Sequence, residues 1–259
     1  LGKKEILKSV SNRTKESLTD LVILDTTGST NDEAKKKLSE IVSFNQSYAV
    51  FAEQQLSGRG RSGKKWVSPA NLNIYFSLAW KSLLKPSELE GLSLSVAVVV
   101  SKKLKPTLTE SLKIKWPNDI IVNGKKISGL MTEIIKQKNT NYIIIGVGIN
   151  VDSSPIISKY PTTFTKEINS SFEKINIIEL FILNFFKKYN KIEYSVYDSI
   201  LKEFKKKLLY LNEIINLQLD RSEFIKGRFE DINLDGSIVI NINGLKQNLY
   251  SARIIDDRN

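Results

Sequence analysis

Glycines and cationic side chains alternate in one short stretch of the chain, a combination suited to binding an anion. The stretch runs from Gly58 to Trp66 and reads Gly-Arg-Gly-Arg-Ser-Gly-Lys-Lys-Trp. Glycine lets the backbone turn and approach a ligand closely, while arginine and lysine pair with phosphate or carboxylate. The stretch therefore predicts a loop that wraps an anion, which is nucleic acid, a nucleotide or a small acid.

The glycine spacing alone leaves several kinds of loop open. A P-loop needs Ser or Thr after its Gly-Lys pair, but Lys65 follows Gly63 and Lys64, so the magnesium-binding hydroxyl is missing and we reject this motif. Gly58, Gly60 and Gly63 fit a dinucleotide-binding Gly-x-Gly-x-x-Gly, although the next residues do not have a helical pattern. An arginine–glycine RNA-binding segment and a surface loop without a ligand remain as alternatives.

A second group of polar residues lies at the end of an expected strand, in Lys115-Trp116-Pro117-Asn118-Asp119. The Asn118 amide is suited to contacting a nucleotide, and the Asp119 carboxylate is the kind of hard oxygen ligand that Mg²⁺ prefers. Asn123-Gly124 then signals a hairpin that carries Lys126. An ammonium group near a carboxyl–phosphate junction stabilises developing charge. The alternatives are an ordinary turn and a solvated lysine.

Two further motifs have both a structural and a ligand-binding interpretation. Gly146-Val147-Gly148-Ile149-Asn150 places glycines inside an apolar strand, which indicates either the close approach of a ligand or another backbone, or a bulge. Ser29, Thr30 and Asn31 precede a helical stretch and suit its N-cap, and they are equally suited to hydrogen-bonding a ligand.

Hydrophobic periodicity predicts a mixed sheet with helices and a small all-β unit after it. Strands are expected at residues 21–25, 48–53, 74–80, 112–116, 120–122, 127–135 and 142–151, and helices at 32–41, 176–190 and 196–211. Residues 91–104 are apolar and fit either a strand or a buried helix. From about residue 213, short apolar runs separated by Asp235-Gly236 and Asn243-Gly244 predict a small β-barrel.

Composition narrows the chemistry that the chain can perform. The 259 residues include no Cys and no His, which excludes disulfides, thiolate chemistry, His-based zinc sites and histidine bases. The net charge of 39 − 28 = +11 fits either a nucleic-acid surface or dispersed lysines on solvated faces. No apolar run approaches the roughly 20 residues of a membrane span, and no signal peptide is evident, so we expect a cytoplasmic protein without membrane contact.

Taken together and in this order, these motifs resemble the biotin–protein ligase (biotin–acetyl-CoA-carboxylase ligase) family. The similarity is carried by residues 28–31, 53–66, 115–119, 126–130 and 146–150. The resemblance implies an α+β fold, in which a mixed β-sheet with flanking helices forms a class II synthetase-like catalytic domain over residues 1–212. A small C-terminal SH3-like β-barrel would follow over residues 213–259.

The resemblance implies an enzyme that acts in two steps. Biotin and Mg-ATP give biotinyl-5′-AMP and pyrophosphate, and biotin then passes to one lysine of a biotin carrier domain of acetyl-CoA carboxylase. ATP, Mg²⁺ and biotin are the expected small molecules, the carrier is the expected protein partner, and a homodimer is a possible assembly. Neither step needs His or Cys, which agrees with the composition.

The resemblance also implies roles for individual residues. Biotin contacts are expected from Ser29, Thr30, Asn31, Gln55, Gly58, Arg59, Gly60, Arg61, Lys126, Gly129 and Gly146. Contacts with ATP or the adenylate are expected from Arg59, Lys64, Trp66, Asn118 and Asn150, and Mg²⁺ is expected at Asp119. Lys126 and Arg61 are the expected catalytic residues, because their charges would face the carboxylate and the α-phosphate.

Two rival functions remain at this point. Lipoate or octanoate ligases share the fold, but they usually carry a histidine in the corresponding loop, and this chain has none. A basic nucleic-acid-binding protein would account for the charge and the Arg/Gly loop only. Some bacterial family members carry an N-terminal winged-helix domain. Because about 20 residues precede the first expected strand, we expect no such domain, no DNA binding and no repressor activity.

Overall fold

The computed structural model describes residues 18, 20–44, 46–82, 85, 89, 91–104, 111–137, 140–155, 161–171, 194–219 and 222–255. The helix expected at 176–190 lies outside these residues. Within the described ranges, no helix is long and apolar enough to cross a membrane.

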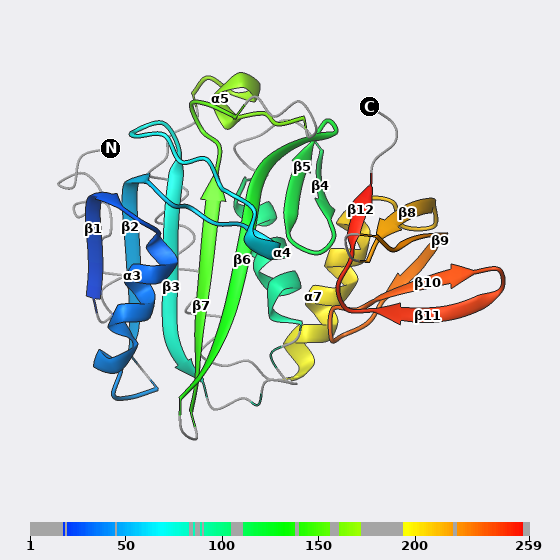
Figure 1. The fold of residues 1–259 in the computed structure, drawn as a ribbon, viewed down its shortest axis with the longest axis horizontal. Coiled ribbons are helices and arrows are strands. Elements are labelled where there is room, and N and C mark those ends of the chain that lie inside the picture. Colours follow the sequence, from blue (N-terminus) through cyan, green and yellow to red (C-terminus); the bar gives the residue numbers. More distant parts are fainter. Residues whose placement is uncertain are drawn as a thin grey trace.

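A seven-stranded mixed sheet forms the larger part of the structure (Figure 1). Across the sheet the strands are β1 (Asp20–Thr27), β2 (Ser47–Gln55), β3 (Ile74–Ser82), β7 (Thr140–Ile149), β6 (Lys125–Gln137), β5 (Asp119–Val122) and β4 (Leu112–Lys115). β1 pairs with β2 in parallel, and the other described pairs in this sheet are antiparallel. The expected mixed sheet is therefore confirmed.

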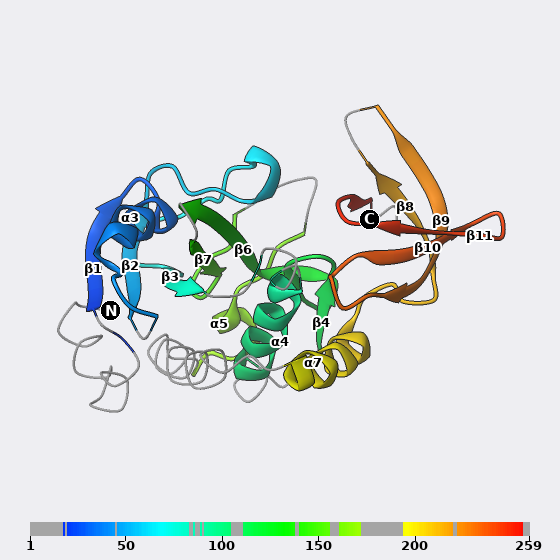
Figure 2. The same cartoon turned by 90° about the horizontal axis from the view of Figure 1, so that it is seen from below.

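Helices cover both faces of this sheet (Figure 2). On one face lie α3 (Thr30–Lys36) and the 3₁₀ helix η1 (Lys37–Glu40), which pack against β2 and β3. On the other lie α4 (Leu92–Leu104) and α7 (Tyr194–Lys207), which are joined by an ion pair between Lys102 and Glu203. The short helix α5 (Thr165–Ile168) follows the end of β7. Burial on both faces explains why central strands such as β3 are apolar almost throughout.

The ambiguity at residues 91–104 is settled as helix, although the segment is rich in β-branched valine. Val96, Val98, Val99 and Val100 are all buried in α4. Most of the described residues of α4 are buried, which blurs the amphipathic pattern by which a helix is recognised, and tertiary packing overrides the weak strand preference of valine.

The C-terminal unit is a five-stranded antiparallel sheet with the order β11-β10-β9-β8-β12. Its strands are β8 (Ile214–Gln218), β9 (Phe224–Ile232), β10 (Ile238–Ile242), β11 (Leu245–Leu249) and β12 (Arg253–Ile255). Both predicted turns are present, and Gly236 and Gly244 have φ values of 87° and 88°, in the left-handed region that glycine tolerates best.

One hydrophobic core runs through both sheets. Ile114 of β4, Leu208 after α7 and Phe229 of β9 all belong to it. The backbone N–H of Leu209 donates to the carbonyl of Ile114 at 2.9 Å, and Lys205 pairs with Asp231 at 2.7 Å. The C-terminal sheet is therefore fixed against the β4 edge of the large sheet.

Candidate active site

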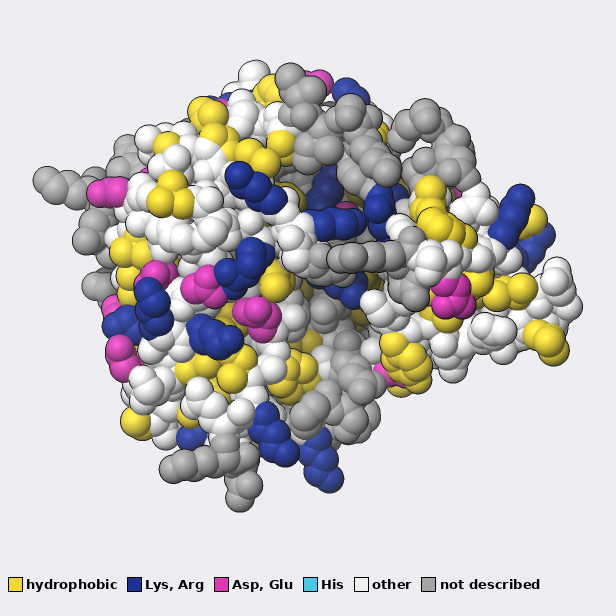
Figure 3. Space-filling model, viewed as in Figure 1, with side chains coloured by type: hydrophobic (Ala, Val, Ile, Leu, Met, Phe, Trp, Pro, Cys, Tyr) yellow, Lys and Arg dark blue, Asp and Glu magenta, His cyan; other side chains and the backbone are white. Residues whose placement is uncertain are grey.

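A cavity of about 670 Å³ lies between the 58–66 loop, the ends of β4 to β7 and the C-terminal sheet. Figure 3 shows Lys and Arg side chains gathered around a hollow in this region. The residues that line it include every predicted site residue except Gly58: Ser29, Thr30, Asn31, Gln55, Arg59, Gly60, Arg61, Lys64, Trp66, Asn118, Asp119, Lys126, Gly129, Gly146 and Asn150. The fold thus brings together motifs that are far apart in the sequence.

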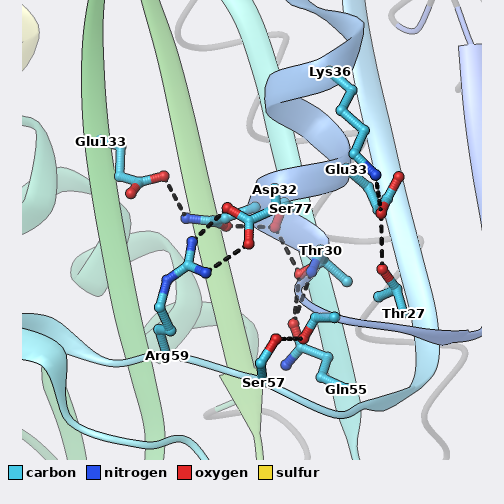
Figure 4. Close-up of polar contacts among 12 residues, drawn as sticks. Thr27, Thr30, Asp32, Glu33, Lys36, Gln55, Ser57, Arg59, Ser77 and Glu133 are labelled. Carbon is cyan, nitrogen blue, oxygen red and sulfur yellow. Dashed lines mark hydrogen bonds and ion pairs between the residues drawn. The ribbon is translucent and has the colours of Figure 1, made fainter.

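One end of the cavity is a neutral hydrogen-bonding network at the start of α3 (Figure 4). The Thr30 backbone N–H and hydroxyl both donate to Gln55 Oε1, at 2.9 and 3.1 Å. Gln55 Nε2 in turn donates to the hydroxyl of Ser68 at 2.9 Å. The Ser77 hydroxyl lies 2.8 Å from Thr30 Oγ1 and 2.5 Å from Asn31 Oδ1. Thr30, Asn31 and Gln55, the members of this network that line the cavity, hold their polar groups in fixed positions beside it.

Asn31 is held on both sides of its amide. Its Nδ2 donates to Glu133 Oε2 at 3.2 Å, while its Oδ1 faces Ser77. A Cβ at Gly146 would collide with this amide, so the glycine makes room for Asn31. The glycine in β7 is thereby explained by close approach of a side chain rather than by a bulge.

Ser29 occupies the N-cap position of α3 without using its hydroxyl as a cap. Its backbone is extended, with φ −157° and ψ 135°, and its side chain makes no capping hydrogen bond. The side chain is buried and lines the cavity. Its hydroxyl is therefore available for a ligand.

The 58–66 loop is closed on itself by its backbone. Trp66 N–H donates to the Gly58 carbonyl at 2.9 Å, and Gly60 N–H donates to the Lys64 carbonyl at 2.7 Å. A Cβ at Gly58 would lie 2.7 Å from the Trp66 carbonyl oxygen, so this glycine permits the loop closure. Gly58 is absent from the cavity lining, which places its role in the loop itself.

The two arginines of the loop have different surroundings. Arg59 forms a bidentate ion pair with Asp32 in the first turn of α3, with N···O distances of 2.6 and 2.5 Å. Hydrogen bonding between them lowers the pKa of Asp32 and raises the pKa of Arg59. Burial lowers the pKa of Arg61, against the opposing charge of Asp119. Arg61 is thus the more desolvated cation.

The other end of the cavity is strongly cationic. Apart from Arg59, which pairs with Asp32 at the α3 end, the positively charged residues in the described lining are Arg61, Lys64, Lys65, Lys115, Lys126 and Arg253, and Asp119 is the sole carboxylate there. The pKa of Lys64 is lowered, first by burial and next by the nearby charge of Arg253. A site of this charge attracts a polyanion such as a nucleoside triphosphate.

Lys126 and Asp119 form an ion pair across the β5–β6 hairpin, with a Nζ···Oδ1 distance of 2.7 Å. Lys126 is fixed through its backbone, because its N–H donates to the Pro161 carbonyl at 2.9 Å and its carbonyl accepts from Thr163 N–H at 3.0 Å. Its Nζ also lies 5.2 Å from the centre of the Trp66 ring. Lys126 therefore has a defined position in the cavity, as its place in the hairpin predicted.

The Trp66 ring lies over two glycines of neighbouring strands. Gly129 and Gly148 pair in register across β6 and β7. A Cβ at these positions would lie 2.8 and 2.5 Å from the indole. The buried Trp66 Nε1 has no hydrogen-bond partner among the described residues. The indole is therefore placed to contact a ligand.

The two asparagines beyond Lys126 are anchored through their amide nitrogens. Asn118 Nδ2 donates to the Leu130 carbonyl at 2.5 Å, and Asn150 Nδ2 donates to the Thr163 carbonyl at 3.1 Å. Asn150 is 1% exposed, and its Oδ1 has no partner within the described ranges. This oxygen is an acceptor left for a ligand, because buried polar atoms rarely remain unpaired.

Sequence reasoning missed several residues of this site. Ser77 interrupts an otherwise apolar strand, which was a usable signal, whereas Glu133 and Asp32 lie in ordinary polar positions. Tyr210 and Arg253 line the cavity from the C-terminal part of the chain. No local sequence pattern predicts a role for Tyr210 and Arg253, because only the fold places them beside the cavity.

Comparison with known proteins agrees with this geometry. Residues 23–150 match the Biotin/lipoate A/B protein ligase family. The match covers 128 of the 259 residues, just under half of the chain, and this region is similar to that family. Among solved structures, the chain is similar to the biotin protein ligase from Aquifex aeolicus in complex with biotin and ATP, with 27% sequence identity and a TM-score of 0.71. That match covers 91% of this chain and 98% of the other.

Two curated relatives match this chain over shorter ranges. The bifunctional ligase/repressor BirA of Escherichia coli is 34% identical over 132 residues, which are 51% of this chain and 40% of the relative. The biotin–[acetyl-CoA-carboxylase] ligase of Mycobacterium tuberculosis is 29% identical over 139 residues, 52% of this chain and 50% of the relative. The match thus spans half or less of these relatives.

Proposed function

We propose that this chain is a biotin–protein ligase that activates biotin with ATP and transfers it to a lysine of a biotin carrier domain. The observation that carries the proposal is the division of one cavity into a neutral hydrogen-bonding end and a cationic end. Asn31 and Gly146 belong to the neutral end, Lys64 belongs to the cationic end, and Lys126 lines the same cavity beside Asp119 and Trp66. Such a cavity suits an uncharged ring that carries a carboxylate, beside a triphosphate.

The neutral end fits the cyclic urea of biotin. Ser29, Thr30, Asn31 and Gln55 supply hydroxyl and amide groups, and the first three are buried. A site built to hydrogen-bond a ligand rejects an analogue that lacks the matching groups, because its own polar groups then stay unpaired. The dithiolane ring of lipoate is such an analogue, so biotin is the better substrate.

The first step is formation of an acyl phosphate anhydride. A biotin carboxylate oxygen attacks the α-phosphorus of ATP, the bond to the β-phosphate breaks, and pyrophosphate leaves. Lys126 stabilises the charge that develops on the α-phosphate oxygens, and Arg61 balances the carboxylate. The desolvated surroundings of Arg61 strengthen this effect.

The nucleotide would occupy the part of the cavity lined by Trp66, Asn118 and Asn150. The Trp66 indole offers a flat surface for the base, and Asn150 Oδ1 offers an unpaired acceptor for an amino group. Lys64 would face the phosphates. Its lowered pKa reflects crowding by burial and by Arg253, which a bound anion would relieve.

The proposal includes a Mg²⁺ ion that binds together with ATP. The described residues contain no group of three or more His, Cys, Asp or Glu side chains that would cage a metal ion. Mg²⁺ is usually held by one or two carboxylates together with substrate phosphates, and Asp119, the carboxylate in the lining, fits that arrangement. The bound ion would neutralise phosphate charge.

In the second step a carrier lysine amine attacks the acyl carbon of biotinyl-5′-AMP. The C–N bond forms, the C–O bond to the phosphate breaks, and AMP leaves with the loss of a proton from the amine. The carrier domain of acetyl-CoA carboxylase is the proposed partner. A division into domains at residues 1–212 and 213–259, a homodimer and a cytoplasmic location remain parts of the proposal, and the start of the second sheet at Ile214 supports the boundary.

The test is formation of biotinyl-5′-AMP by the purified chain, measured as biotin-dependent exchange of labelled pyrophosphate into ATP. Exchange with biotin but not lipoate, followed by labelling of a carrier domain, supports the proposal. Exchange with lipoate alone would reassign the substrate, and no exchange with either acid would refute the ligase assignment.

A further inference from the structure

The strand end that carries Asn118 and Asp119 is tied to the C-terminal sheet. Trp116, which is 3% exposed, donates its indole N–H to the carbonyl of Gly236 at 2.8 Å. Gly236 lies in the turn between β9 and β10. Figure 2 shows this sheet beside β4, the strand that leads to Trp116.

The turn that presents this carbonyl is itself firmly built. Asp235 Oδ1 accepts hydrogen bonds from the Ser237 N–H at 2.8 Å and from its hydroxyl at 2.7 Å. Asn233 N–H donates to the Ser237 carbonyl at 2.8 Å, and Gly236 N–H donates to the Asn233 carbonyl at 3.0 Å. The position of the Gly236 carbonyl is therefore fixed by the turn, independently of Trp116.

Trp116 precedes Asn118 by two residues and Asp119 by three, and these are the residues proposed to contact the nucleotide and Mg²⁺. Asn118 pairs with the Leu130 backbone in both directions, and Asp119 pairs with Lys126. These contacts orient the segment from one side only. The indole hydrogen bond holds the segment from the other side, at the contact between the two sheets.

We infer that the β9–β10 turn, Asn233–Ser237, positions the Trp116–Asp119 segment for adenylation, with Trp116 as the positioning residue. This inference rests on the proposed function and deepens it. Misplacing reacting groups by about 1 Å costs on the order of a hundredfold in rate. A shift of this segment therefore affects the step that uses ATP, because the proposed Mg²⁺ ligand Asp119 serves only that step, and it leaves the rate of acyl transfer from saturating adenylate unaffected.

The experiment compares Trp116→Phe, Asp235→Ala and their double mutant with the wild-type chain. Trp116→Phe keeps an aromatic ring but removes the indole N–H donor. Asp235→Ala removes the two hydrogen bonds from Ser237 that stabilise the turn, and it changes no residue of the large sheet. Asn241→Ala is the matched control, because it removes the side-chain acceptor for Gly244 N–H in the neighbouring β10–β11 turn. Melting temperatures confirm that each variant is folded.

Two activities are measured for each variant. In biotin-dependent pyrophosphate exchange, kcat/KM for ATP should fall about tenfold or more in Trp116→Phe and in Asp235→Ala, with KM for biotin unchanged. The double mutant should be no worse than the poorer single mutant, because both changes break one connection. Transfer from synthetic biotinyl-5′-AMP to a carrier domain should stay at the wild-type rate.

Several outcomes would overturn the inference while leaving the ligase assignment intact. These are wild-type exchange rates in Asp235→Ala, effects that add in the double mutant, an equal loss in Asn241→Ala, or equal losses in exchange and transfer. Asp235→Ala decides the matter if Trp116→Phe does not fold. A wild-type chain that forms no biotinyl-5′-AMP would refute the proposed function and this inference with it.

Discussion

Arg59 and Asp32 join the glycine-rich loop to the helix that carries the polar end of the cavity. Their two N···O distances are 2.6 and 2.5 Å, and the side chains are 39% and 41% exposed. Exposed ion pairs are worth about 0.2–1 kcal/mol. The Arg59 guanidinium, which the family resemblance implies near biotin, pairs with Asp32 and holds the loop against α3, as Figure 4 shows.

Asp32→Asn should loosen this loop without removing a group that touches the reacting atoms. Loss of about 1 kcal/mol at most corresponds to a roughly fivefold change in the opening equilibrium. We therefore expect biotinyl-5′-AMP to dissociate up to about fivefold faster, with its rate of formation little changed. Glu40→Gln, which breaks the exposed Lys37–Glu40 pair away from the loop, is the control. Identical dissociation rates for Asp32→Asn and the wild-type chain would contradict this role.

The same pair predicts a pH dependence of stability. The Arg59 hydrogen bond holds the pKa of Asp32 below its ordinary 3.8, so the unfolded chain binds this proton more readily than the folded one. The contribution of the pair is complete above pH 3.8 and is lost as pH falls through the depressed value. Urea denaturation should show Asp32→Asn less stable than the wild-type chain at pH 7, with the difference shrinking below pH 3.8. A difference that grows on acidification would be evidence against the pairing.

Gly146→Ala should weaken biotin binding through Asn31. The new methyl group displaces an amide that forms hydrogen bonds with Ser77 and Glu133. The displaced amide then loses its hydrogen bond with biotin, and at about 0.5–1.5 kcal/mol for one hydrogen bond the affinity should fall by roughly 2- to 13-fold, as measured by calorimetry. Adding Asn31→Ala to this variant should cost little more, since the interaction is already lost. An unaltered biotin affinity in Gly146→Ala would exclude this arrangement.

Lys64 should couple ATP binding to pH. Burial and the nearby Arg253 lower its pKa, so it loses its proton at a lower pH than an ordinary lysine. Bound phosphates favour the charged form, and ATP affinity should therefore weaken as pH rises through the depressed value, below 10.5. Lys64→Gln should bind ATP less tightly at neutral pH and show a flatter profile between pH 7 and 10. An equally steep profile in the variant would assign the titration to another group.

Parts of the fold and of the site that have a local sequence pattern could be predicted from the sequence. Alternating apolar residues and the Asn123-Gly124 turn predicted the β5–β6 hairpin, and with it the defined position of Lys126. Residues 91–104 remained ambiguous because most of the described residues of α4 are buried, which blurs the periodicity that separates helix from strand. The glycine at 146 was recognisable as a position of close approach, although the approaching group proved to be Asn31.

The parts of the site that escaped prediction depend on long-range packing. Glu133 matters because β6 and β7 pair in a register that places it near Asn31. The Trp116–Gly236 hydrogen bond joins positions 120 residues apart. Neither has a signature in its own neighbourhood, since a polar residue on a strand and a turn glycine are both common.

The central claim is that Lys126 stabilises charge during adenylation, and biotin-dependent pyrophosphate exchange by Lys126→Ala tests it most directly. Lys125→Ala is the matched control, because this neighbouring lysine pairs with Glu167 at 3.6 Å and does not line the cavity. We predict a loss of about 10²- to 10³-fold in exchange for Lys126→Ala and nearly full activity for Lys125→Ala. Exchange by a folded Lys126→Ala variant at close to the wild-type rate would contradict the account.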